Sequence, residues 1–107
     1  MCGIAGLCGL GAARQAERIQ CAVDATAHRG PDGHGVVSLP SGLCVLGHCR
    51  LAILDLSQAG NQPMTAAESG CTIVYNGECY NHADLRRRMR VPFRSTSDTE
   101  TVLHWLA

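Results

Sequence analysis

The apolar positions at the start of the chain predict a strand followed by a helix. Residues Cys2 to Gly9 form a short apolar run typical of a buried strand. From Ala12 to Ala27, apolar residues recur at helical spacing between polar side chains, as expected for a helix with one face on a sheet. The pattern stops at His28-Arg29-Gly30-Pro31-Asp32-Gly33, where glycine and proline predict a structured loop.

The next apolar runs predict a β-hairpin. Gly35–Leu39 and Leu43–Cys49 are separated by Pro40-Ser41-Gly42, a composition typical of a turn. Arg50–Leu56 continues the apolar character and leads into a turn-rich stretch, Ser57–Asn61.

The second half of the chain predicts one strand and two helices. Cys71–Tyr75 has strand character and is closed by Asn76-Gly77, and Asn81 with Asp84 predicts a helix that runs to Met89. Ser97-Asp98-Thr99-Glu100 has the capping-box pattern of a further helix. Strands covered by helices imply a layered α+β domain, and the stop inside the last helix suggests that a remainder of the domain is missing.

Composition narrows the classes of function. The 107 residues carry nine basic and nine acidic side chains, so charge gives no case for nucleic acid or a membrane as partner. No apolar run has the length of a membrane span. The seven cysteines are irregularly spaced without a C-x-x-C pair, which argues against a disulfide framework and a structural zinc site. We therefore expect reduced thiols, no metal and a cytoplasmic location.

Cys2 is the first candidate for chemistry. Removal of Met1 would place its thiol and a free α-amine on the same Cα. An α-amine has a pKa of about 7.7–8.0, so a useful fraction is neutral near pH 7 and can accept the proton of the thiol. Taken alone, a Met-Cys start is more often a small buried apolar residue than a nucleophile.

Downstream residues could complete a site for hydrolysis of a carboxamide. The Asn76 side chain and the Gly77 backbone N–H could stabilise an oxyanion. The Arg50 guanidinium suits an α-carboxylate, and the Asp98 carboxylate suits an α-ammonium. Each also has a structural interpretation: a hairpin turn at Asn76-Gly77, a surface ion pair for Arg50, and a favourable helix N-terminus for Asp98.

The order of the motifs resembles the N-terminal glutaminase domain of glutamine-hydrolysing asparagine synthetases, which are class II amidotransferases. The motifs are Met1-Cys2-Gly3-Ile4-Ala5-Gly6, His28-Arg29-Gly30-Pro31-Asp32, Leu46-Gly47-His48-Cys49-Arg50-Leu51, Gln62-Pro63-Met64, Tyr75-Asn76-Gly77-Glu78-Cys79-Tyr80-Asn81 and Ser97-Asp98-Thr99-Glu100. The resemblance covers residues 1–107, and it implies a partial glutaminase domain without the synthetase domain. The implied fold is the N-terminal-nucleophile hydrolase type, a four-layer αββα sandwich of which this chain holds the N-terminal portion.

The resemblance also implies a role for each site residue. Cys2 would be the nucleophile and, through its amine, the base, while Asn76 and Gly77 would form the oxyanion hole. Arg50 and Asp98 would hold the two charged groups of glutamine. Glu78 would also line the site. Arg29 would lie behind the nucleophile in a supporting role.

The implied activity is hydrolysis of glutamine to glutamate and ammonia through a Cys2 thioester, which supplies nitrogen for asparagine synthesis from aspartate. ATP and magnesium would belong to the missing synthetase domain, and the full-length form is expected to be a homodimer. Three alternatives stay open: the glutaminase portion of another class II amidotransferase, a non-catalytic fragment or partner-binding piece, and a thiol-rich metal protein.

Overall fold

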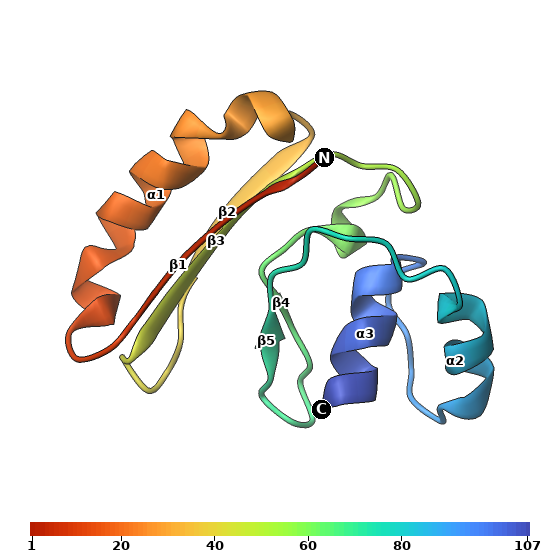
Figure 1. Cartoon of the computed structure of the whole chain (residues 1–107). Helices are drawn as coiled ribbons and strands as arrows, with labels where there is room; N and C mark the ends of the chain where they lie inside the picture. Colours follow the sequence, from red (N-terminus) through yellow and green to blue (C-terminus); the bar gives the residue numbers. More distant parts are fainter.

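The computed structural model describes residues 1–107 and begins with a three-stranded antiparallel sheet that carries one helix. The strand order is β1-β3-β2, with β1 at Gly3–Cys8, β2 at Gly33–Ser38 and β3 at Cys44–Arg50. Helix α1 (Ala16–Ala25) lies along one face of this sheet (Figure 1). The predicted first strand, the hairpin and the helix on a sheet are therefore confirmed.

The apolar core of the chain lies between α1 and β3. Its buried members are Ile19, Val23, Val45 and Cys49. Gly47 allows the helix to approach the sheet closely, because a Cβ at this position would lie 2.6–2.7 Å from methyl groups of Val23 and Ile19. The sequence thus places a small residue where the helix crosses the middle strand.

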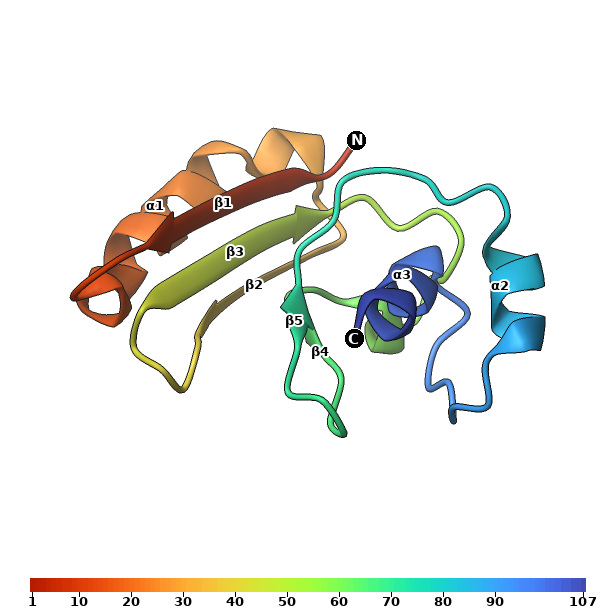
Figure 2. The ribbon, with the colours of Figure 1, turned by 60° about the horizontal axis from the view of Figure 1, so that its bottom comes forward.

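The second region consists of a short two-stranded sheet and two helices. Strands β4 (Met64–Thr65) and β5 (Thr72–Ile73) are antiparallel, and helices α2 (His82–Arg88) and α3 (Asp98–Leu106) follow. Figure 2 shows β4 and β5 between the three-stranded sheet and α3, with α2 on the far side of α3. The chain is thus an α+β structure in two regions that meet near the carboxyl end of β3.

Several predicted elements are shorter than the sequence suggested. The predicted helix Ala12–Ala27 is divided into a 3₁₀ turn at Ala12–Gln15, α1, and a second 3₁₀ turn at Ala27–Arg29. The predicted strand Cys71–Tyr75 is paired only at Thr72–Ile73. A hairpin turn at Asn76-Gly77 is wrong, because β5 ends before it and no paired strand follows it.

The predicted cap of α3 is confirmed, with one change of partner. The Ser97 hydroxyl accepts a hydrogen bond from the Thr99 N–H at 3.2 Å. The Glu100 carboxylate does not return to Ser97 but accepts from the N–H groups of Arg94 and Ser95 and from the Ser95 hydroxyl. The acidic residue of the cap therefore fixes the loop before the helix.

The expectation that every thiol is reduced is wrong for one pair. Cys8 and Cys44 stand opposite each other in the register of β1 and β3, with 4.2 Å between their Cα atoms, and they form a disulfide. The other five cysteines are free. Sequence spacing hides this pair because 36 residues separate its members. No helix in the chain has the length and apolar character needed to cross a membrane.

Candidate functional site

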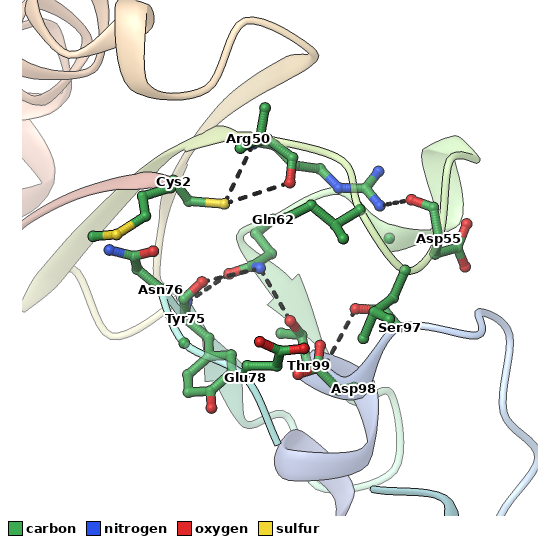
Figure 3. A pocket seen from close by; sticks show the side chains of 16 residues that line it. Cys2, Arg50, Asp55, Gln62, Tyr75, Asn76, Glu78, Ser97, Asp98 and Thr99 are labelled. Atoms are coloured by element: carbon green, nitrogen blue, oxygen red, sulfur yellow. Dashed lines mark hydrogen bonds between the residues drawn. The ribbon is translucent and has the colours of Figure 1, made fainter. Parts of the chain in front are cut away.

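One cavity gathers most of the predicted site residues at the junction of the two regions. Its volume is about 300 Å³, at the lower end of the range for small-molecule sites. Six predicted residues line it: Cys2, Arg50, Asn76, Gly77, Glu78 and Asp98. They come from the start of β1, the end of β3, the segment after β5 and the first turn of α3 (Figure 3). Arg29 does not line the cavity.

Cys2 directly precedes β1 and is held by the main chain that follows β3. Its Sγ accepts a hydrogen bond from the Leu51 N–H at 3.3 Å and lies 3.8 Å from the Leu51 carbonyl oxygen. The carbonyl oxygen of Cys2 accepts from Arg29 Nε at 3.2 Å. Arg29 therefore contacts the main chain of the candidate nucleophile from outside the cavity.

The Arg50 guanidinium is buried and points largely toward the loop after β3. Its Nη1 donates to the Ser57 carbonyl at 2.7 Å and to Asn61 Oδ1 at 3.0 Å, and its Nη2 donates to the Asp55 carbonyl. Gly60 makes room for it, because a Cβ there would fall on the guanidinium. The Nε–H makes no hydrogen bond within the chain, so a carboxylate would be bound side-on through Nε and Nη2.

The segment that carries Asn76 and Gly77 is exposed, and it packs against its own neighbour, Tyr75. A Cβ at Gly77 would lie 2.7 Å from the tip of the Tyr75 ring. The main chain of Tyr75 is fixed by Gln62, whose Oε1 accepts from the Tyr75 N–H at 2.6 Å. Figure 3 shows the Asn76 side chain among those that line the cavity with Cys2. A side-chain amide and a glycine N–H therefore belong to the same cavity as the thiol.

Asp98 begins α3 and is buried, with 6% of its surface exposed. Its Oδ2 accepts from the Cys79 N–H at 2.8 Å, which leaves Oδ1 for a ligand in the cavity. Glu78 is exposed at the rim of the same cavity. The cavity thus has carboxylates on the α3 side and the guanidinium on the β3 side, an arrangement that suits a zwitterionic amino acid.

Burial and charge change the proton affinity of two groups near the cavity. Burial lowers the pKa of His48 below its ordinary value, with the Tyr75 backbone opposing the shift and the charge of Arg50 reinforcing it. Neither ring nitrogen of His48 has a hydrogen-bond partner, and the imidazole is neutral near pH 7. Burial and the negative charge of Asp98 raise the pKa of Tyr75. Both groups are therefore uncharged near pH 7.

The sequence did not assign a role to several residues that shape the cavity. Leu51 contributes its N–H to Cys2, and Asp55 accepts from the Ser57 hydroxyl at 2.6 Å and from the Thr96 N–H at 2.7 Å. Those hydrogen bonds, with the Ser57 hydroxyl first, hold the pKa of Asp55 well below its ordinary value. Gln62 appeared only as part of a motif. Main-chain donors and long-range side-chain contacts leave no periodic signal in a sequence.

Metal binding finds no support in the arrangement of side chains. No group of three or more histidine, cysteine, aspartate or glutamate side chains is placed to hold a metal ion. The chemistry available at the cavity is that of a thiol, amide donors and charged groups for an amino acid.

Comparison with known proteins gives a consistent family. Residues 1–107 match the model of the glutamine amidotransferase domain. The chain is 38% identical to an asparagine synthetase (glutamine-hydrolyzing) of Asparagus officinalis, across 97% of the chain and 18% of that protein. It is 39% identical to asparagine synthetase (glutamine-hydrolyzing) 3 of Bacillus subtilis, across 97% of the chain and 18% of that protein.

A relative with a different name matches equally well. The chain is 36% identical to the amidase chyE of Penicillium rubens, across 96% of the chain and 17% of that protein. The chain thus spans about a fifth of the length of the curated relatives it matches. No solved structure matches it.

Proposed function

Because the chain belongs to the glutamine amidotransferase domain family, we propose that its cavity hydrolyses glutamine to glutamate and ammonia. The observation that carries the proposal is the convergence of Cys2, Asn76 and Asp98 on one cavity from three separate parts of the chain. A thiol, an amide donor and a charged anchor are the parts that acyl transfer from a carboxamide requires. Each of them is supported by its own contacts.

Cys2 acts as the nucleophile once Met1 has been removed. The α-amine takes the thiol proton, and Sγ bonds to the carboxamide carbon of glutamine while the C=O π electrons move to oxygen. The tetrahedral intermediate collapses, the C–N bond breaks, and the amine returns the proton to the leaving ammonia. Water then cleaves the thioester to glutamate and restores the thiol.

The remaining residues bind and stabilise. The Asn76 amide and the Gly77 N–H donate to the oxyanion, and loss of one such donor costs about 10²–10³ in rate. Asp98 binds the α-ammonium of glutamine, and Arg50 binds the α-carboxylate through its free Nε–H. Glu78 lines the amino-acid end, and Arg29 supports Cys2 through its carbonyl oxygen.

The names of two relatives suggest the use of the ammonia. Both are glutamine-hydrolyzing asparagine synthetases, which supports asparagine synthesis as the reaction that consumes it. The amidase chyE keeps a different acceptor open. ATP and magnesium in a synthetase domain, a homodimer and a cytoplasmic location stay predictions.

The four-layer αββα sandwich is also a proposal. Helix α1 on one face of the three-stranded sheet supports it, since that pairing is the outer helix layer and the adjoining sheet of such a fold. A second sheet would cover the opposite face, where Ile4 is half-exposed. An experimental structure of the larger protein would test this arrangement.

The test is alkylation by diazo-oxo-norleucine, a reactive glutamine analogue, read by intact mass. A chain without Met1 should gain one adduct on Cys2, and excess glutamine should block it. Cys2→Ala should abolish both the adduct and glutamine turnover without unfolding the chain, while Cys21→Ala, an exposed free thiol on α1, should keep both. An adduct that survives Cys2→Ala would contradict the assignment of the nucleophile.

The role of the amine is tested separately. A chain that keeps Met1 has an amide in place of the α-amine of Cys2, so hydrolysis should fail while glutamine binding survives. Turnover by a chain shown to keep Met1 would contradict the amine as base.

A further inference from the structure

Gln62 is a buried polar residue between the loop after β3 and strand β4, with 7% of its surface exposed. Its side chain makes three hydrogen bonds. Oε1 accepts from the Tyr75 N–H at 2.6 Å, and Nε2 donates to the Tyr75 carbonyl at 3.3 Å and to Thr99 Oγ1 at 3.2 Å. Figure 3 shows Gln62 between Tyr75 and the start of α3. One amide therefore satisfies both polar groups of the Tyr75 main chain.

The Tyr75 main chain needs such a partner because no strand supplies one. Strand β5 ends at Ile73, and the exposed residues Asn76 and Gly77 follow Tyr75 directly. A primary amide carries a donor and an acceptor side by side, so it can donate to a carbonyl and accept from an N–H of one residue, as a neighbouring strand would. Gln62 thus replaces a strand pairing at the base of the Asn76-Gly77 segment.

The same side chain reaches the other end of the cavity. Thr99 is buried and adjoins Asp98, whose carboxylate accepts from the Cys79 N–H. The segment from Tyr75 to Cys79 is therefore anchored at its first residue by Gln62 and at its last by Asp98. The two anchors are joined through the first turn of α3.

We propose that Gln62 is a positioning residue of this site, which holds the Tyr75 main chain so that Asn76 and Gly77 direct their donors at the substrate carbonyl. The inference rests on the proposed function for its catalytic meaning. Gln62 lines the cavity, and its amide is bonded to Tyr75 and Thr99. It acts by coupling the oxyanion donors to the helix that carries Asp98.

The variant that tests the coupling is Gln62→Met, which keeps the length of the side chain and removes all three hydrogen bonds. Gln58→Met is the matched control, because Gln58 is exposed and its side chain makes no hydrogen bond. Thr99→Val removes only the link to α3. Each variant is studied in the full chain without Met1.

The first measurement compares two ligands. Glutamate γ-semialdehyde adds the Cys2 thiol across its C=O, so that an S–C bond forms and the thiol proton passes to oxygen. The product carries its oxygen where the oxyanion would lie, whereas glutamate reports binding of the amino-acid end alone. Gln62→Met should weaken binding of the semialdehyde by about 10–100-fold, which is less than the loss of about 10²–10³ for a removed oxyanion donor because the donors are displaced but still present. It should weaken binding of glutamate by less than about 3-fold. Thr99→Val should have a smaller effect in the same direction, and Gln58→Met none.

The second measurement is amide hydrogen exchange at Tyr75 and Cys79, whose N–H groups donate to Gln62 and Asp98. Exchange at both amides should become at least about 10-fold faster in Gln62→Met and stay unchanged in Gln58→Met. Equal weakening of both ligands, or unchanged exchange, would overturn the inference. A wild-type chain that forms no semialdehyde adduct would contradict the proposed function and with it the catalytic role of Gln62. Faster exchange in that case would still establish that Gln62 holds the segment.

Discussion

The two regions of the chain are held together by different kinds of interaction. The buried residues before position 48 are apolar and pack between α1 and the three-stranded sheet. Beyond position 54 the buried side chains are mostly polar, and only Ala66 and Leu103 are apolar. The buried polar residues of this second region are Asp55, Gln62, Ser95, Ser97, Asp98, Thr99, Glu100 and Thr101.

This difference explains why the cavity lies where the two regions meet. Apolar packing is non-directional, so it stabilises a platform without fixing the orientation of polar groups. Buried hydrogen bonds are directional, and a satisfied network specifies one geometry. Cys2 and Arg50 reach the cavity from the apolar region, and Asn76 and Asp98 reach it from the polar region. The apolar region thus supports Cys2 and Arg50, and the polar region supports Asn76 and Asp98.

Removing the central cation of the polar region should have the largest effect on stability. Arg86 on α2 donates to Thr101 Oγ1 at 2.7 Å and to the carbonyls of Ser95 and Ser97 at 2.8 and 2.6 Å. Arg86→Met should lower the free energy of unfolding by about 4 kcal/mol, because hydrogen bonds to a charged group are each worth about 1.5–3 kcal/mol. Chemical denaturation provides the measurement.

The same variant tests whether the two regions are separate. Hydrogen exchange in Arg86→Met should accelerate across α2 and α3 and change little in α1 and β3. Arg88→Met is the matched control, since Arg88 is exposed on the same helix and makes no hydrogen bond. Equal acceleration in both regions would show that they unfold as one unit and that the contrast has no energetic meaning.

The sequence predicts the apolar region far better than the polar one. The spacing of Ile19 and Val23 defines the face of α1 that packs on the sheet, and the runs around Pro40-Ser41-Gly42 define the hairpin, because apolar burial is periodic. The pairing of β4 with β5 and the division of the Ala12–Ala27 helix were not predicted. Strands of two residues and 3₁₀ turns of three or four residues are too short to leave a periodic pattern of apolar residues.

The candidate site shows the same limit. Motif resemblance brought Cys2, Asn76 and Asp98 forward, and the fold brings them to one cavity. It gave no role to Gln62 or Leu51, whose contacts span 13 and 49 residues. It predicted Arg50 as the residue that binds the α-carboxylate, but not the three hydrogen bonds that tie its guanidinium to the following loop. Such partners can be read only from the folded chain.

Lowering the pH should unfold the polar region before the apolar region. Hydrogen bonds from Ser57 and Thr96 lower the pKa of Asp55, and for Glu100 burial opposes ionisation but the bonds from Ser95 and Arg94 outweigh it, so its pKa is also lowered. Unfolded carboxyls titrate near about 3.9–4.3, so the native state binds fewer protons there. The stabilisation of the folded state by these two carboxylates is complete above that pH range and is lost as the pH falls below about 4.

Exchange or near-ultraviolet circular dichroism between pH 6 and pH 3 measures this order of events. The near-ultraviolet signal of Trp105 on α3 should fall at a higher pH than the exchange protection of the α1 amides. Asp55→Asn removes one of the two titrating groups and should make the transition shallower as well as lowering stability at pH 6. Simultaneous loss of both signals would contradict a selective acid opening.

The smallest effect is expected from a cavity in the apolar region. Val23 on α1 is 2% exposed and packs in the cluster with Val45. Val23→Ala removes two carbon atoms, worth about 0.8 kcal/mol each, and leaves a void, so the loss should be about 2–3 kcal/mol. Ala22→Gly, at a partly buried neighbour on the same helix, controls for the helix itself and should cost about 1 kcal/mol.

Hydrogen exchange in Val23→Ala should accelerate in α1 and β3 while the α3 amides keep their protection, the reverse of the pattern for Arg86→Met. Val23→Ala could instead accelerate exchange in α3 as well and weaken the protection of Cys2 by glutamine against alkylation. In that case the apolar region would determine the geometry of the site, and the polar hydrogen bonds would depend on it.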